Sequence, residues 1–136
     1  MSITNLFQSL GAPLHNSRRS WGSVRAEDGV VFLRVWQNPI HKHEGKIFMR
    51  LTDNEFFQNN DPQNSGYIER LDHVRLLEGG ATSYMVMCIP RDEKAVPREI
   101  KNFDRRQLRL GGQVIEVNGD KWLEIKARVP VEKIIL

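Results

Sequence analysis

The chain contains 136 residues, of which 40% are apolar and 27% are charged, and its mean hydropathy is −0.47. This size suits one domain with one core, so we treat residues 1–136 as a single domain. The longest apolar run, residues 84–89, is far shorter than the roughly 20 residues that a membrane-spanning helix needs. We therefore expect a soluble protein with no membrane partner.

The charge and the cysteine content bear on the possible partners and on the cellular location of the protein. Lysine and arginine number 20 and aspartate and glutamate 17, which gives a formal net charge of +3 and a pI of about 9.2. This mild excess permits an anionic partner without requiring one. Cys88 is the single cysteine, so no internal disulfide can form and we expect a reducing, cytoplasmic location. The first residues lack the cationic start and long apolar stretch of a secretory signal peptide.

The first elements are a short helix and a β-hairpin. Apolar residues at helical spacing predict a helix within residues 2–10, ended by Gly11. Asp28-Gly29 then lies between two strand-like runs and predicts a two-residue type I′ turn. Counting outward from that turn places Val24 opposite Leu33 and Trp21 opposite Trp36.

Side chains alternate along a strand, so this register sorts the hairpin into two faces. One face is apolar and is expected to lie on a core: Gly22, Val24, Ala26, Val31, Leu33 and Val35. The other mixes aromatic and cationic groups: Trp21, Ser23, Arg25, Phe32, Arg34 and Trp36. The second face is our candidate binding surface, unless a helix or a second sheet covers it.

Five further elements follow in chain order, after a loop at residues 38–45. They are a strand at 46–51, a mobile polar loop at 52–66, an amphipathic helix at 67–78, a strand at 81–89 buried on both faces, and a strand at 98–103 that starts near Pro97. Asn118-Gly119 predicts a last hairpin, which pairs Glu116 with Lys121 and Val114 with Leu123.

These elements amount to six or seven strands and two helices, mostly in antiparallel order. The chain shows no alternation of strand, helix and strand, which argues against a doubly wound fold. We predict an α+β domain with a curved or barrel-like sheet.

The aromatic and cationic face of the hairpin carries the functional prediction. Aromatic rings stack on unpaired or flipped bases, each stack contributing roughly 1–3 kcal/mol, and arginines add cationic contacts to phosphates. Basic residues flank the hairpin on both sides. We therefore predict a nucleic-acid-binding domain, for DNA or RNA, rather than an enzyme, with these contact residues: Trp21, Arg25, Phe32, Arg34, Trp36, Arg18, Arg19 and Lys42.

Two alternatives remain at this point. The same aromatics would also suit a small-molecule pocket or the subunit interface of a homo-oligomeric accessory protein. Glu124-x-Lys126, with Asp104 or Asp120, is half of a pattern used by Mg²⁺-dependent nucleases. No cofactor is predicted. His41 and His43 lie in a predicted loop without an adjacent third ligand, so we predict no metal site there.

Two short stretches carry a resemblance. Trp21-Gly22 followed by Val-Phe-Leu-Arg-Val-Trp-Gln at 31–37 resembles parts of small accessory domains associated with restriction systems and mobile elements. Tyr67-x-Glu69-Arg70-x-x-His73 before a Gly-Gly turn adds to it. The resemblance defines no family; it implies a setting near nucleic acid and transfers no residue role.

Overall fold

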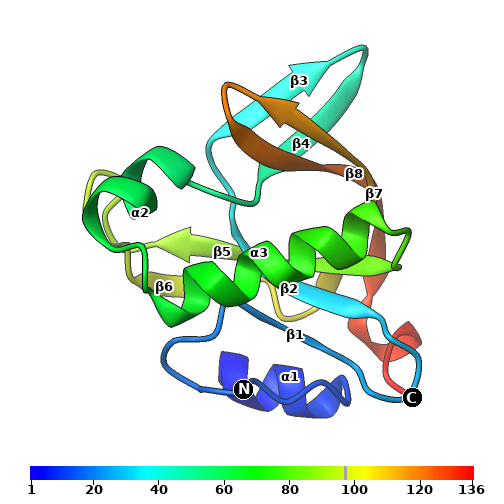
Figure 1. Cartoon of the computed structure of the whole chain (residues 1–136). Helices are drawn as coiled ribbons and strands as arrows, with labels where there is room; N and C mark the ends of the chain where they lie inside the picture. Colours follow the sequence, from blue (N-terminus) through cyan, green and yellow to red (C-terminus); the bar gives the residue numbers. More distant parts are fainter. Residues whose placement is uncertain (97) are drawn as a thin grey trace.

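The structure is a computed structural model that describes residues 1–96 and 98–136, so Pro97, near the predicted strand start, lies outside the described residues. The described residues form three α-helices, and Figure 1 shows the helices arranged around one sheet. In chain order the elements are α1 (Ile3–Ser9), β1 (Gly22–Val24), β2 (Val31–Trp36), β3 (Ile40–His43), β4 (Lys46–Arg50), α2 (Asn54–Asn60), α3 (Ser65–Glu78), β5 (Ser83–Pro90), β6 (Ile100–Phe103), β7 (Gln107–Val117), β8 (Asp120–Pro130) and the short 3-10 helix η1 (Val131–Lys133).

The sheet has eight strands in the described chain, in the order β1-β2-β5-β7-β8-β4-β3, with β6 paired to β5 beside this path. All pairs are antiparallel except β2 and β5, which run parallel. The prediction of a mixed α and β content is confirmed. The predictions of six or seven strands and two helices are wrong, because the described residues form eight strands and three α-helices. Of the predicted curved or barrel-like sheet, the barrel-like alternative is wrong, because the sheet is open, and its one parallel pair makes it mixed.

The missed elements lie in stretches that looked like loops. β3 forms because Glu44 and Gly45 adopt positive φ angles of 52° and 76°, which closes a tight turn onto β4. Glutamate is not a usual residue at such a position, so the sequence carried little sign of the turn. α2 occupies the polar stretch expected to be a mobile loop, where the backbone N–H of Asn54 and the hydroxyl of Thr52 both donate to Asp120 Oδ1.

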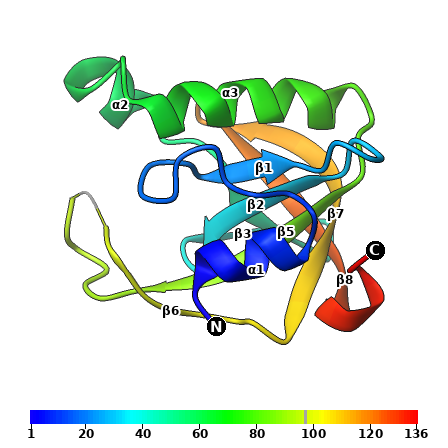
Figure 2. The ribbon, with the colours of Figure 1, turned by 90° about the horizontal axis from the view of Figure 1, so that it is seen from below.

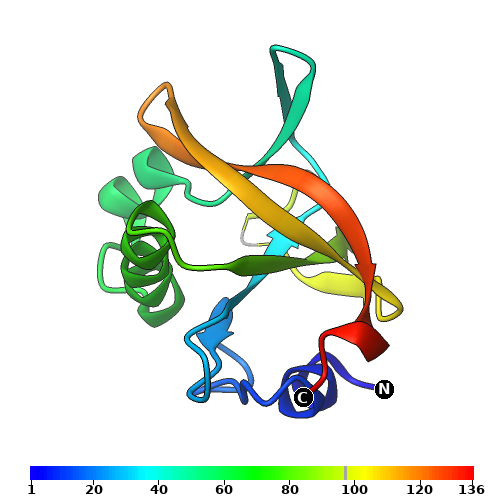
Figure 3. The ribbon, with the colours of Figure 1, turned by 90° about the vertical axis from the view of Figure 1, so that its right-hand side faces the viewer.

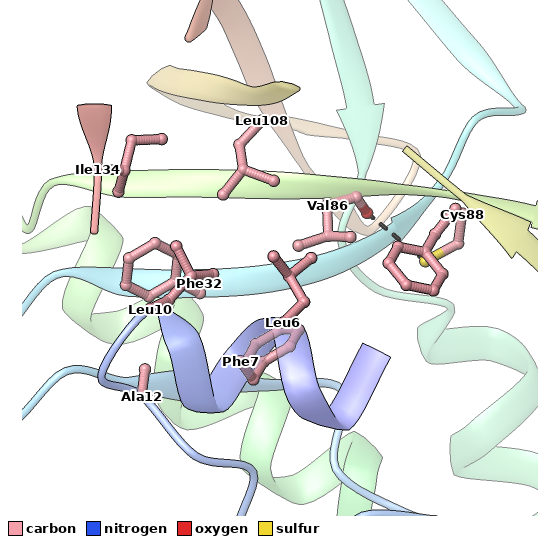
Figure 4. Close-up of a cluster of buried hydrophobic side chains, with 10 residues drawn as sticks. Leu6, Phe7, Leu10, Ala12, Phe32, Val86, Cys88, Leu108 and Ile134 are labelled. Carbon is pink, nitrogen blue, oxygen red and sulfur yellow. Dashed lines mark hydrogen bonds between the residues drawn. The ribbon is translucent and has the colours of Figure 1, made fainter. Parts of the chain in front are cut away.

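The helices cover opposite faces of the sheet, as Figure 2 shows, with α3 on one side and α1 on the other. Both central strands, β2 and β5, are therefore buried on both faces, as expected for a parallel pair. One apolar cluster lies on the α1 side, and Figure 4 shows most of it: Leu6, Phe7, Leu10, Ala12, Phe32, Val86, Cys88, Phe103, Leu108 and Ile134. A second lies on the α3 side: Val31, Leu33, Val35, Met49, Leu51, Val74, Leu77, Met85, Met87 and Leu123.

β7 and β8 form a long hairpin that curves from the core to its turn at Asn118-Gly119, and Figure 3 shows this curvature most clearly. Its predicted register is confirmed, with Glu116 opposite Lys121 and Val114 opposite Leu123. The register shifts at Gly111, where a Cβ atom would come within 2.2 Å of Ser83 Oγ. The bend therefore depends on a residue without a side chain at this position.

The first hairpin exists, but its predicted register is wrong by two residues. Gly22 lies opposite Leu33, and Val24 opposite Val31. The loop is longer than a two-residue turn because the Arg25 guanidinium binds Asp28 at 3.0 Å, while the backbone N–H of Gly29 donates to the Arg25 carbonyl oxygen at 2.8 Å. A shift of two preserves the alternation, so the apolar side of β2 still faces the core as predicted.

Candidate binding cavity

Two of the predicted interface residues are buried in the fold. Phe32 has no exposed surface and stacks on Tyr84, with ring centroids 5.8 Å apart. Arg25 is 4% exposed, and its Nη1 donates to the carbonyl oxygens of Leu10 at 3.0 Å and Ile134 at 2.8 Å. The expectation that Arg25 and Phe32 lie on an accessible face is therefore wrong: α1 and the C-terminal segment cover that part of the hairpin.

A third predicted residue lies elsewhere on the surface. Lys42 is exposed on β3, where it pairs in register with Ile47 of β4. It does not line the cavity that the other predicted residues share.

The remaining five predicted residues line one cavity of about 970 Å³. They are Arg18, Arg19, Trp21, Arg34 and Trp36. Figures 1 and 2 show the segments that bound this cavity gathered at the same end of the molecule: the loop after α1, the end of β2, α2, the start of α3 and the β5–β6 connection. The sequence therefore identified part of a real concavity, although not the flat hairpin face that was expected.

Four aromatic residues line this cavity: Trp21, Trp36, Phe56 and Phe57. Trp21 meets Phe57 edge-on at 5.0 Å, and Phe57 stacks on Tyr67 at 4.9 Å with an interplanar angle of 11°. Phe56 and Phe57 come from α2, which lies in the stretch where the sequence predicted a polar loop. Two adjacent phenylalanines within a stretch rich in Asn, Asp and Gln were the available sign of an amphipathic helix.

Trp21 is held close to the first turn of α3. A Cβ atom on Gly66 would come within 2.2 Å of Trp21 Nε1 and 2.4 Å of the Arg19 carbonyl oxygen. The helix starts here because the Asn64 side chain accepts from the backbone N–H of Tyr67 at 3.0 Å. A glycine in this turn thus sets how near the Trp21 segment can approach.

Arg70 joins three walls of the cavity. Its Nη1 donates to the Leu51 carbonyl oxygen at 2.9 Å, and its Nη2 donates to those of Trp21 at 2.9 Å and Arg34 at 2.6 Å. Burial lowers the pKa of Arg70 to about 9, and the neighbouring charge of Arg34 adds to the effect. Arg70 is therefore still a cation at neutral pH, and its charge is shared among three backbone carbonyl groups.

Arg34 is the second largely buried cation among the residues that line the cavity, and burial also lowers its pKa. Its Nη1 donates to the Ser20 carbonyl oxygen at 2.9 Å. Its Nη2 has no hydrogen-bond partner within the described chain, and its side chain lines the cavity. Arg34 thus offers a donor in a partly desolvated setting, where a hydrogen bond to an anion is stronger than at an open surface.

The charge around the cavity is mainly positive. Six arginines line it, against three carboxylates. Arg50 is neutralised by Asp53 at 2.6 Å and Asp120 at 3.5 Å. Arg98 is held by the backbone carbonyl oxygen and the side chain of Asn38. In contrast, the exposed side chains of Arg18 and Arg19 form no ion pair or hydrogen bond in the part of the chain that the structure describes.

Three of these cations were missed by the sequence reading: Arg50, Arg70 and Arg98. They are far apart in sequence and come from three different places in the fold: the end of β4, the middle of α3 and the β5–β6 connection. His73, also on α3, is buried beside Gly22. Burial lowers the pKa of His73 to about 4, with a further contribution from Arg70.

The residues of the nuclease alternative are dispersed. Glu124 accepts from the Gln113 backbone at 3.0 Å, Asp104 pairs with Arg109 at 2.9 Å, and Asp120 binds the start of α2. Among the described residues, no group of three or more His, Cys, Asp or Glu side chains is placed to hold a metal ion. No helix in the described chain is long and apolar enough to cross a membrane.

No family model, curated protein or solved structure matches this chain. Any inference about the function of this protein therefore depends on the residues and geometry of the cavity.

Proposed function

We propose that this protein is a nucleic-acid-binding domain whose contact site is the cavity rather than the open hairpin face. The observation that carries the proposal is the combination of four aromatic side chains with an excess of arginines around one concavity of about 970 Å³. Aromatic rings supply stacking surface for bases, and guanidinium groups supply donors that fit phosphates.

The positions of the arginines that have unpaired donor groups also support nucleic-acid binding. Arg18 and Arg19 lie exposed on the loop at the cavity, and Arg34 lies deeper, with one amino group unpaired within the described chain. A nucleic acid has phosphates at regular intervals, so it can contact the exposed cations of the cavity lining while one nucleotide contacts the more buried Arg34.

The test is a binding titration with a fluorescently labelled single-stranded oligonucleotide at several salt concentrations. Each phosphate contact releases counterions, so we expect the affinity of the wild type to fall steeply as salt rises. Arg18→Ala combined with Arg19→Ala should weaken binding. It should also lower the slope of log affinity against log salt concentration by about two, one for each lost phosphate contact. The matched control is Lys126→Ala with Arg128→Ala, which removes the same charge from exposed positions on β8 outside the cavity. No binding to any DNA or RNA, or equal losses in both variants, contradicts the proposal.

A free small molecule is the second candidate, favoured by the shape of the site. A concavity of this size, partly lined by apolar groups, lies within the range of about 300–1,000 Å³ that suits small ligands. A small ligand would need no exposed arginines at the mouth. Under this alternative, the Arg18→Ala, Arg19→Ala variant would bind its ligand with unchanged salt dependence.

A further inference from the structure

Two of the aromatic residues that line the cavity lie outside its packed group of aromatic rings. Trp21, Phe57 and Tyr67 pack against one another. Trp36, at the end of β2, packs against the apolar cluster on the α1 side and has the Arg98 guanidinium 5.8 Å from its ring centroid, but it contacts no other aromatic ring among the described residues. Phe56 meets only the edge of Phe57, at 5.0 Å and 88°. Trp36 and Phe56 are both partly buried, come from separate elements and line the same cavity.

The bases of an intact duplex cannot use these rings. In a duplex each base is stacked on its neighbours, and its flat faces are covered. Ring stacking inside a cavity therefore requires a base that has left the stack, as at a strand end, in a single strand or at a bulge. The cavity volume fits one such unit rather than a duplex segment.

Polar groups suited to a nucleotide lie around the same space. Arg34 Nη2 has no partner in the described chain, and the side-chain amide of Gln63 forms no hydrogen bond there either. A guanidinium matches the two oxygens of a phosphate, and an amide matches the donor and acceptor pattern of a base edge. Asn64 and Ser65 line the cavity at the start of α3, where the helix dipole favours negative charge.

From these observations we infer that the cavity takes the base of a single unstacked nucleotide, with Trp36 and Phe56 contacting its faces and Arg34 its phosphate. This inference depends on the proposed function and specifies what part of a nucleic acid the site recognises. The protein would then distinguish interrupted or single-stranded nucleic acid from a perfect duplex.

Three end-labelled probes test the inference with the full chain: a short paired duplex, the same duplex with one bulged adenosine, and the same duplex with an abasic unit at the bulge. We expect the bulged duplex to bind at least about tenfold more tightly than both others, because only it supplies a free base. Equal affinities for all three overturn the inference but leave charge-driven nucleic-acid binding intact. No binding to any of them, or to a single strand, overturns the proposed function itself.

Adenosine monophosphate serves as a fourth probe. It should bind far more weakly than the bulged duplex, because it lacks the neighbouring phosphates that Arg18 and Arg19 would contact. Binding as tight as that of the bulged duplex at the same salt concentration overturns the inference in favour of a free-nucleotide site.

Single substitutions test whether the unstacked base contacts Trp36 and Phe56. Trp36→Leu should reduce the tenfold preference for the bulged adenosine to within about twofold, and Trp36→Phe should restore much of it. Trp122→Leu is the matched control, since it removes an indole outside the cavity. Should Trp36→Leu fail to fold, Phe56→Leu provides the second test, because α2 contains no buried residue. A tenfold preference that survives in every leucine variant that folds, Trp36→Leu or Phe56→Leu, overturns the inference.

Discussion

The guanidinium of Arg70 donates to the carbonyl oxygen of Trp21 at 2.9 Å and lies 5.6 Å from the centroid of its ring. Arg70 comes from the middle of α3, and Trp21 from the segment just before β1. The same group also binds the carbonyl oxygens of Leu51 and Arg34. One buried side chain thus fixes the backbone on three sides of the cavity.

Removing that group should destabilise the protein. In Arg70→Met three carbonyl groups each lose a hydrogen bond from a charged donor. Such bonds contribute about 1.5–3 kcal/mol each, but the substitution also removes the desolvation cost of a buried cation, so we expect the free energy of unfolding to fall by about 2–4 kcal/mol. Urea denaturation measures it. Arg75→Met, on the same helix but exposed, is the control and should change stability by less than about 0.5 kcal/mol. Equal effects in the two variants would argue against the role of Arg70.

Gly66→Ala should weaken nucleic-acid binding. Alanine normally stabilises a helix relative to glycine by about 1 kcal/mol. Here its Cβ would meet Trp21 and the Arg19 carbonyl oxygen, so both must move out of place. Oligonucleotide affinity and the tryptophan emission spectrum measure the effect. Gly79→Ala, at the other end of α3, meets only ordinary contacts at 3.4 Å or more and should bind as the wild type does.

Acid should destabilise the fold through His73. Its pKa in the folded protein is about 4, against 6.5 for the unperturbed side chain, so the unfolded state takes up the proton first as the pH falls. The stability from this group is complete above pH 6.5 and is lost progressively down to about pH 4. In His73→Gln this part of the decline should disappear. Urea midpoints at several pH values between 4 and 8 provide the measurement, and an identical pH profile in the variant would contradict the assignment.

Cys88 should be unreactive in the folded state. Burial raises the pKa of its thiol to about 11, so almost no thiolate is present at pH 8. A chromogenic disulfide reagent should label the native protein slowly and the urea-unfolded protein quickly. Rapid labelling of the native protein at pH 8 would show that the segment around Cys88 opens.

The two hairpins show how far the sequence can predict this fold. Asn118-Gly119 predicted the β7–β8 register correctly because the turn has two residues and no side chain interferes. Asp28-Gly29 predicted a register that is wrong by two because Arg25 and Asp28 bind each other and lengthen the loop. The partner atoms of Arg25 on Leu10 and Ile134 lie far along the chain, so no local pattern indicates them.

The candidate site was predictable only in part, for a similar reason. Trp21, Arg34 and Trp36 share a cavity because they lie on or beside one hairpin, which local counting can identify. Phe56 joins them through α2, whose start is bound to Asp120 of β8, and Arg98 joins them through the β5–β6 connection, whose position depends on the parallel pairing of β2 with β5. That pairing joins strands about 50 residues apart, and its register follows from packing on both faces rather than from a turn.

The three tryptophan indole N–H groups give the most direct test of the central claim, because two belong to the cavity and one does not. Trp21 and Trp36 line it, whereas Trp122 lies on β8 next to His41, with ring centroids 5.7 Å apart. Indole signals of ¹⁵N-labelled protein, assigned with Trp→Phe variants, are followed during titration with a single-stranded oligonucleotide. Binding at the cavity predicts shifts for Trp21 and Trp36 and none for Trp122. Movement of the Trp122 signal alone, or of no signal at saturation, would contradict the claim.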